Sequence, residues 1–132
     1  MTTTITEEIE ACAATAFEAL RHWDIAHGID RQAQWRDLDP RIQQTFRNGA
    51  HGVVVIGDTV ASAHERWCED MRSQGWKRGA VKSDLMQVHP ALCLFGELQS
   101  ADQRKTEIFV RSVRMMAKAL GILTPSQKPA KL

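Results

Sequence analysis

The sequence predicts a mainly α fold, a small helical domain of about four helices with a minor β element. Apolar residues recur at three- and four-residue steps in three stretches, the spacing that places them on one face of a helix. Two stretches begin with capping-box spacing, Thr4 with Glu7 and Ser100 with Gln103, in which side chains satisfy free backbone N–H groups. The 132 residues suffice for one hydrophobic core.

The first helix is expected from about Ile5 to His27. Its apolar face comprises Ile5, Ile9, Cys12, Ala16, Leu20, Trp23 and His27. Gly28 follows directly and is a natural stop, because glycine readily adopts the left-handed conformation that closes a helix.

A second helix is expected to start at Asp39 and Pro40, a capping side chain followed by a first-turn proline. One side of it carries Ile42, Phe46 and Ala50. The Asn48-Gly49 pair could end this helix early. Residues 53–56 are all apolar, and they fit either a short strand or a buried continuation of the helix.

A third helix is expected to begin near Gly57 and Asp58 and to end at Gly75. Its apolar face is marked by Val60, by Ala63 or His64, and by Trp67 and Met71. Residues 76–96 are irregular and predict loops with at most a short hairpin.

The last helix follows Ser100 and stops at Gly121. Its broad apolar stripe comprises Ile108, Phe109, Val113, Met116, Ala117 and Leu120. We expect residues 122–132 to form a mobile tail, because they contain two prolines and no periodicity.

The composition argues against several classes of partner. Seventeen basic residues face sixteen acidic ones, which does not indicate capture of nucleic acid or of an anionic membrane. Cys12, Cys68 and Cys93 are widely spaced and form no CxxC motif, so we expect reduced thiols, the first two buried in helices. No secretion signal and no membrane-length apolar run are visible, and the expected location is cytoplasmic.

The most informative stretch lies between residues 64 and 98. It contains, in order, His64-Glu65-Arg66-Trp67, Gly75-Trp76-Lys77-Arg78-Gly79, His89-Pro90 and Glu97-Leu98. This order and spacing resemble the ryanodine receptor (RyR) repeat, in the single-copy form that occurs in bacterial and phage proteins. The resemblance covers residues 56–121, which leaves residues 1–55 as an N-terminal helical segment packing on the repeat. Arg78 departs from the family pattern, which usually has an aromatic residue there.

The resemblance implies a non-catalytic module that binds an adenine-type nucleotide or a derivative, as a sensor or by sequestering it. Tryptophan rings would stack on the base, and nearby cations would contact phosphate. The expected ligand-binding residues are Trp76, Trp67, His64, Lys77, Arg78, Lys82 and His89. Each also has a structural interpretation: core packing for Trp67, hydrogen-bonded histidines at 64 and 89, and a solvated face for the cations.

Other functions have weaker support in the sequence. Five scattered histidines lack zinc-site spacing, and no nucleophile elbow, phosphate loop or dinucleotide fingerprint occurs, so we expect no enzyme, cofactor or metal. A pairing of Cys68 with His89 is conceivable in space. A helix-turn-helix around Asn48-Gly49 is disfavoured by the neutral charge. The stronger alternative is a protein-interaction or structural helical module without a small-molecule ligand, which includes self-association as a homodimer.

Overall fold

The computed structural model describes residues 2–123, with side chains from residue 5 onward. Its α-helices are α1 (Thr2–Ala26), α2 (Pro40–His51), α3 (Val60–Ser73) and α4 (Ser100–Leu120). Short helical turns lie at Trp35–Asp37, Gly52–Ile56 and Phe95–Glu97, and the strands are β1 (Lys77–Arg78) and β2 (Val88–His89). The predicted mainly α domain with four helices and a minor β element is confirmed for this part of the chain. None of these helices is long and apolar enough to span a membrane.

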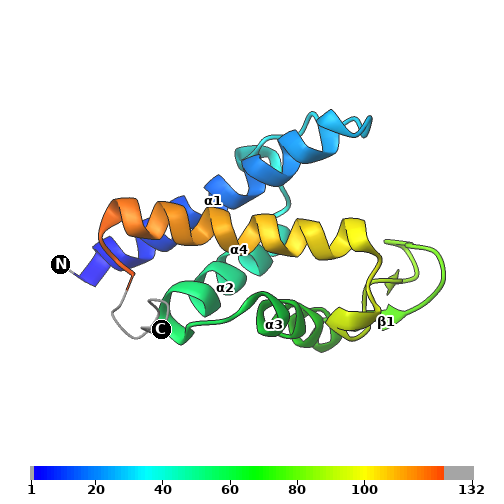
Figure 1. Ribbon diagram of the computed structural model, residues 1–132. Helices are drawn as coiled ribbons and strands as arrows, with labels where there is room; N and C mark the ends of the chain where they lie inside the picture. The colour runs from blue at the N-terminus through cyan, green and yellow to red at the C-terminus, as the bar shows by residue number, and fades with distance from the viewer. Residues whose placement is uncertain (1, 124–132) are drawn as a thin grey trace.

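The helices pack around α4, which runs across the molecule in Figure 1. α1 crosses α4 on one side, while α2 and α3 lie below the pair, and β1 sits at the far end of α3. The buried core is built largely from small side chains: Ile9, Cys12, Ala13, Ala16, Ala50, Val53, Val54, Ala63, Val110, Val113 and Ala117. Such side chains let helix backbones approach closely, and both the N-terminal segment and residues 56–121 contribute to this one core.

Both expected N-terminal capping boxes are wrong. α1 begins at Thr2, which places Thr4 inside the helix rather than at its cap. The cap of α4 is Gln99, whose side chain makes no capping bond. The Gln103 amide instead donates to the carbonyl of Phe95, 3.0 Å away, in the turn before the helix. The side chain thus satisfies a tertiary partner that the local sequence does not reveal.

The expected helix ends are confirmed at three glycines. Gly28, Gly75 and Gly121 have φ values of 83°, 98° and 74°, in the left-handed region that other residues rarely adopt. Ile122 and Leu123 pack against the core. The remainder of the expected mobile tail, residues 124–132, lies outside the described residues.

α2 begins as predicted. The Asp39 carboxylate accepts a hydrogen bond of 2.8 Å from the Arg41 backbone N–H, and Pro40 occupies the first turn. The helix does not end at Asn48-Gly49. A Cβ atom on Gly49 would lie 2.9 Å from the Phe109 ring, so this glycine allows α2 to approach α4.

Residues 53–56 form a helical continuation rather than a strand. Gly52–Ile56 is a single π-helical turn in which Val53 and Val54 are buried, whereas Val55 and Ile56 are exposed. Helical geometry lets two adjacent valines enter the core together, which a strand with alternating faces would not allow.

The expected short hairpin after α3 is present as an antiparallel bridge between Ser83 and Val88, but the two strands themselves are not part of a hairpin. β1 and β2 pair in parallel, Lys77 opposite Val88 and Arg78 opposite His89. Gly79 permits this pairing, because a Cβ atom there would overlap the Val88 side chain. The chain between the strands therefore forms a wide loop, which protrudes beside β1 in Figure 1.

Candidate functional site

A cavity of about 470 Å³ opens between the four α-helices and the loop that follows β1. Its size is within the range of small-molecule sites, which extends from about 300 to 1,000 Å³. Apolar and aromatic side chains contribute much of the wall, including Leu20, Phe46, Trp67, Pro90, Leu98 and Phe109. The cavity therefore lies where the N-terminal segment meets the part that resembles the RyR repeat.

The structure brings together four of the seven expected ligand-binding residues. His64, Trp67, Lys82 and His89 line the cavity. Trp76, Lys77 and Arg78 do not. Trp76 is half-buried with its ring centroid 6.3 Å from that of His89, while Lys77 and Arg78 are exposed in β1. A contact of these three residues with a ligand stays a prediction.

Trp67 is the aromatic centre of this wall. Its ring stacks on His64 with centroids 5.6 Å apart, and it meets His89 edge to face at 5.1 Å. The tryptophan is half-buried rather than enclosed in the core. Its indole therefore combines a fixed position with surface that remains accessible from the cavity.

His64 lies on α3 and contacts the segment that follows β2. It is 4% exposed, and its Nε2 lies 2.8 Å from the carbonyl oxygen of Cys93. The Cys68 sulfur lies 3.3 Å from the same nitrogen. Burial raises the pKa of the Cys68 thiol, which keeps it protonated and unreactive. Cys68 therefore contacts His64 rather than His89, the histidine considered as its partner in the sequence analysis, and its thiol is unreactive.

His89 is fixed by its own loop. The backbone N–H of Ala91 donates to its Nδ1 at 3.0 Å. Burial, and after it the positive charge of Lys82, lowers the pKa of His89 below its usual value of 6.5. The ring is therefore neutral at physiological pH, with its proton on Nε2.

The charges around the cavity are close to balanced. Its four lining cations are Arg31, Arg66, Lys82 and Lys105. Each already faces a carboxylate: Arg31 and Lys105 share Asp24, Arg66 pairs with Asp58, and Lys82 pairs with Asp84. Lys105 Nζ lies 2.9 Å from Asp24 Oδ1 and forms an ion pair with it. The angle of this contact does not suit a hydrogen bond, so Asp24 Oδ1 accepts no hydrogen bond from the described residues. Asp70 and Asp102 also line the wall.

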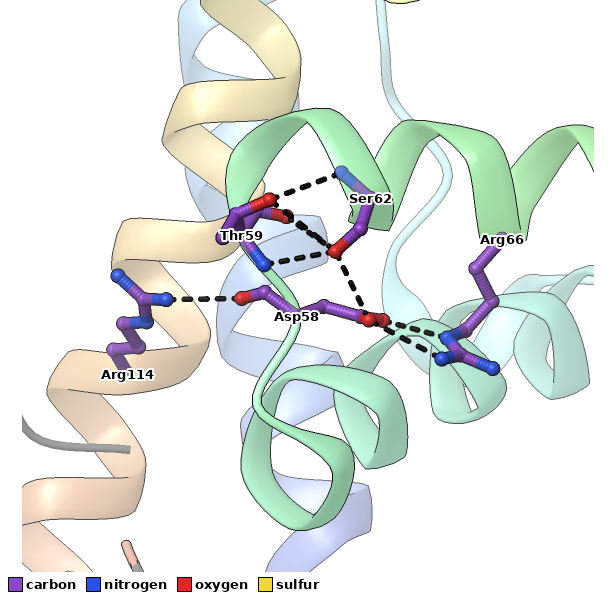
Figure 2. Close-up of polar contacts among 5 residues, drawn as sticks. All are labelled: Asp58, Thr59, Ser62, Arg66 and Arg114. Carbon is purple, nitrogen blue, oxygen red and sulfur yellow. Dashed lines mark hydrogen bonds and ion pairs between the residues drawn. The ribbon is translucent and has the colours of Figure 1, made fainter. Parts of the chain in front are cut away.

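A network around Asp58 positions Arg66 at this wall (Figure 2). Asp58 is 5% exposed, and both its carboxylate oxygens accept hydrogen bonds from the Arg66 guanidinium. Ser62 donates to the same carboxylate at 3.1 Å, and Arg114 of α4 donates to the Asp58 carbonyl at 2.9 Å. The hydrogen bond to Asp58 raises the pKa of Arg66, so its charge is permanent. α3 is thereby tied to α4 at the point where its cap forms.

The sequence did not indicate the part of the wall that precedes residue 56. Leu20, Arg31, Phe46 and Gly49 all line the cavity. Phe46 lies on a predicted apolar helix stripe, and such a stripe does not distinguish a core ring from a ring in a cavity wall. The one available signal was Gly49 inside a helix, which is typical of a close contact with another element.

Within residues 2–123, no cluster of three or more His, Cys, Asp or Glu side chains could hold a metal ion. No family model matches the chain, and no curated protein matches it. The resemblance to the RyR repeat stays a prediction that rests on the motifs between residues 64 and 98.

Proposed function

We propose that this chain is a non-catalytic module that binds a nucleotide or a nucleotide-derived small molecule in the cavity, as a sensor or by sequestering it. The observation that carries the proposal is the partly buried Trp67 ring, which contacts two histidines and lines a cavity of about 470 Å³. Stacking of a base on such a ring contributes roughly 1–3 kcal/mol.

The charge balance favours a ligand with few phosphates. Lys82 pairs with Asp84, whose side chain is 81% exposed, and an exposed pair of this kind contributes little and exchanges readily. A phosphate can replace that carboxylate as the partner of Lys82. Asp70 and Asp102 in the wall would repel a multiply charged group. We therefore expect a nucleoside monophosphate to bind more tightly than the corresponding triphosphate.

The same contacts support binding without turnover. Cys68 is buried with a raised pKa, which removes the obvious nucleophile. His64 and His89 each use one ring nitrogen to hold the backbone, at Cys93 and Ala91. Rings fixed in this way suit recognition of a ligand better than proton transfer.

The proposal is tested by thermal unfolding with adenosine, AMP, cyclic AMP and ATP. A ligand that binds only the folded state at 100 times its dissociation constant stabilises it by about 2.7 kcal/mol. We expect AMP to raise Tm by several degrees, and Trp67→Leu to abolish the shift relative to the variant's own Tm. Trp76→Leu is the comparison variant that tests the other predicted tryptophan contact; because this ring lies outside the cavity lining, a ligand in the cavity should still raise the Tm of Trp76→Leu.

Two results would contradict the proposal. If none of the four compounds raises Tm, the cavity is not a nucleotide site. If Trp76→Leu abolishes the shift while Trp67→Leu retains it, the ligand binds outside the cavity.

A second candidate function is protein interaction through the loop between β1 and β2. Val81, Leu85 and Met86 are 76%, 92% and 68% exposed, and the basic residues Lys77 and Arg78 lie at the base of the loop. Exposed apolar side chains grouped in this way are typical of docking surfaces. Like charges would oppose symmetrical pairing of two such loops, so a partner with carboxylates around an apolar patch fits better than a homodimer.

This second function is tested by affinity capture with the wild-type chain and a Leu85→Ser/Met86→Ser variant. We expect a partner that is retained by the wild type at low salt and lost with the variant, because its binding combines apolar burial with screened charge contacts. Equal capture by both chains would contradict docking through this loop.

A further inference from the structure

The hydrogen bonds of His64 determine which of its nitrogens is left for a ligand. A carbonyl oxygen only accepts, so the contact of 2.8 Å with Cys93 places the ring proton on Nε2. Nδ1 then carries a lone pair, and it has no hydrogen-bond partner in the part of the chain that the structure describes. The side chain is nevertheless 4% exposed and lines the cavity. Nδ1 is not fully enclosed, so a hydrogen-bond donor on a ligand in the cavity can reach it.

His89 presents the opposite group. A backbone N–H only donates, so the contact of 3.0 Å from Ala91 requires a lone pair on Nδ1. The neutral ring therefore has its proton on Nε2, and this N–H makes no hydrogen bond to any residue between 5 and 123. Both histidines have the same tautomer, but His64 bonds to the backbone through Nε2 and His89 through Nδ1.

We propose that His64 Nδ1 and His89 Nε2 form an acceptor–donor pair that recognises a nucleobase edge with an adjacent donor and acceptor, as in adenine. His64 stacks on one face of the Trp67 indole with an offset of the ring centroids to 5.6 Å, and His89 meets the indole edge to face. A base that stacks beside His64 on that face would direct its edge at the two imidazoles. An exocyclic amine would donate to His64 Nδ1, and a neighbouring ring nitrogen would accept from His89 Nε2. This inference rests on the proposed function and adds the determinant of base specificity.

Two amide variants separate recognition from folding. In His64→Gln the amide nitrogen can replace Nε2 as the donor to Cys93, and the remaining amide oxygen does not coincide with the position of Nδ1. In His89→Asn the amide oxygen can replace Nδ1 as the acceptor from Ala91, and the remaining amide nitrogen does not coincide with the position of Nε2. His51→Gln is the control, because this histidine is exposed on α2 and is not part of the cavity lining.

The probes are AMP and purine riboside 5′-monophosphate, which lacks the exocyclic amine, measured by titration calorimetry. We expect the wild type and His51→Gln to bind AMP roughly tenfold or more tightly than the purine compound, since the latter leaves His64 Nδ1 unpaired. His64→Gln should weaken AMP by a similar factor and remove the discrimination. Equal affinities in the wild type, or discrimination retained by His64→Gln, would overturn the inference.

A ligand-free measurement distinguishes this inference from the proposed function. Long-range proton–nitrogen NMR spectra of the imidazoles should show the Nε2–H tautomer for both His64 and His89 at neutral pH. If AMP binds but either ring is the Nδ1–H tautomer, the inference fails and the proposed function stands. If no nucleotide binds, both fail.

Discussion

Gly52→Ala separates the geometry of the Asp58 network from ordinary helix propensity. Gly52 is buried within helical backbone, where alanine is normally about 1 kcal/mol more favourable than glycine. A Cβ atom at this position would overlap both the Asp58 carboxylate and the Arg66 side chain. The substitution must therefore displace the ion pair.

The expected magnitude follows from these opposing terms. Separating the charged hydrogen bonds of the buried Asp58 costs roughly 1–3 kcal/mol, against a helix gain of about 1 kcal/mol. We expect Gly52→Ala to lower the free energy of unfolding by up to about 2 kcal/mol in urea denaturation followed by circular dichroism. Gly96→Ala is the control and should change stability little, because a Cβ atom there meets nothing within 4 Å.

A double-mutant cycle tests the cause of this loss. In an Asp58→Ala/Arg66→Ala background the overlapping atoms are absent, so adding Gly52→Ala should be neutral or stabilising, with a coupling of about 2 kcal/mol. If Gly52→Ala stabilises the wild type, or destabilises both backgrounds equally, the reasoning about this close approach is refuted.

Three further predictions concern other parts of the molecule. Burial and the charge of Lys82 hold the pKa of His89 below 6.5, so the unfolded chain binds more protons than the folded chain as the pH falls. The contribution of His89 to stability should be complete above about pH 6.5 and should be lost as the pH drops through the folded pKa. A pH series of unfolding measurements on His89→Asn should lack this decline. Asp24→Asn should cost about 1–2 kcal/mol in urea denaturation, because this buried carboxylate is the shared partner of two cations, and an unchanged midpoint would contradict that role. Leu85→Ser should change stability by less than about 0.5 kcal/mol, since its side chain is 92% exposed; a larger loss would mean that the loop is packed.

Much of the fold was predictable because its signals are local. Gly28, Gly75 and Gly121 each follow an apolar stripe, and each adopts the positive φ that ends a helix. Asp39 and Pro40 act within one turn of α2. Such features depend on nearby residues, which the sequence shows directly.

The errors arise where distant residues determine the outcome. Ser100 and Gln103 have the spacing of a capping box, but Gln103 bonds to Phe95 instead. The parallel pairing of β1 with β2 places Gly79 against the Val88 side chain, a contact between two separate segments. Neither outcome is encoded in a local pattern.

The candidate site was predicted in part for the same reason. His64, Trp67 and His89 are close in space because α3 and β2 are close in sequence and pack together. Phe46 and Phe109 are 63 positions apart in the chain, yet both line the cavity, with ring centroids 5.9 Å apart. The motifs between residues 64 and 98 therefore indicate only about half of the residues that line the cavity.

We propose that the ligand binds in the cavity between the N-terminal segment and α3. Titrating isotope-labelled protein with AMP and following backbone amide shifts tests it most directly. We expect the largest shifts around Trp67 and His89 and also at Asn48 and Gly49 of α2, which line the same cavity. Shifts confined to the exposed residues Lys77 and Arg78, or no shifts at all, would contradict it.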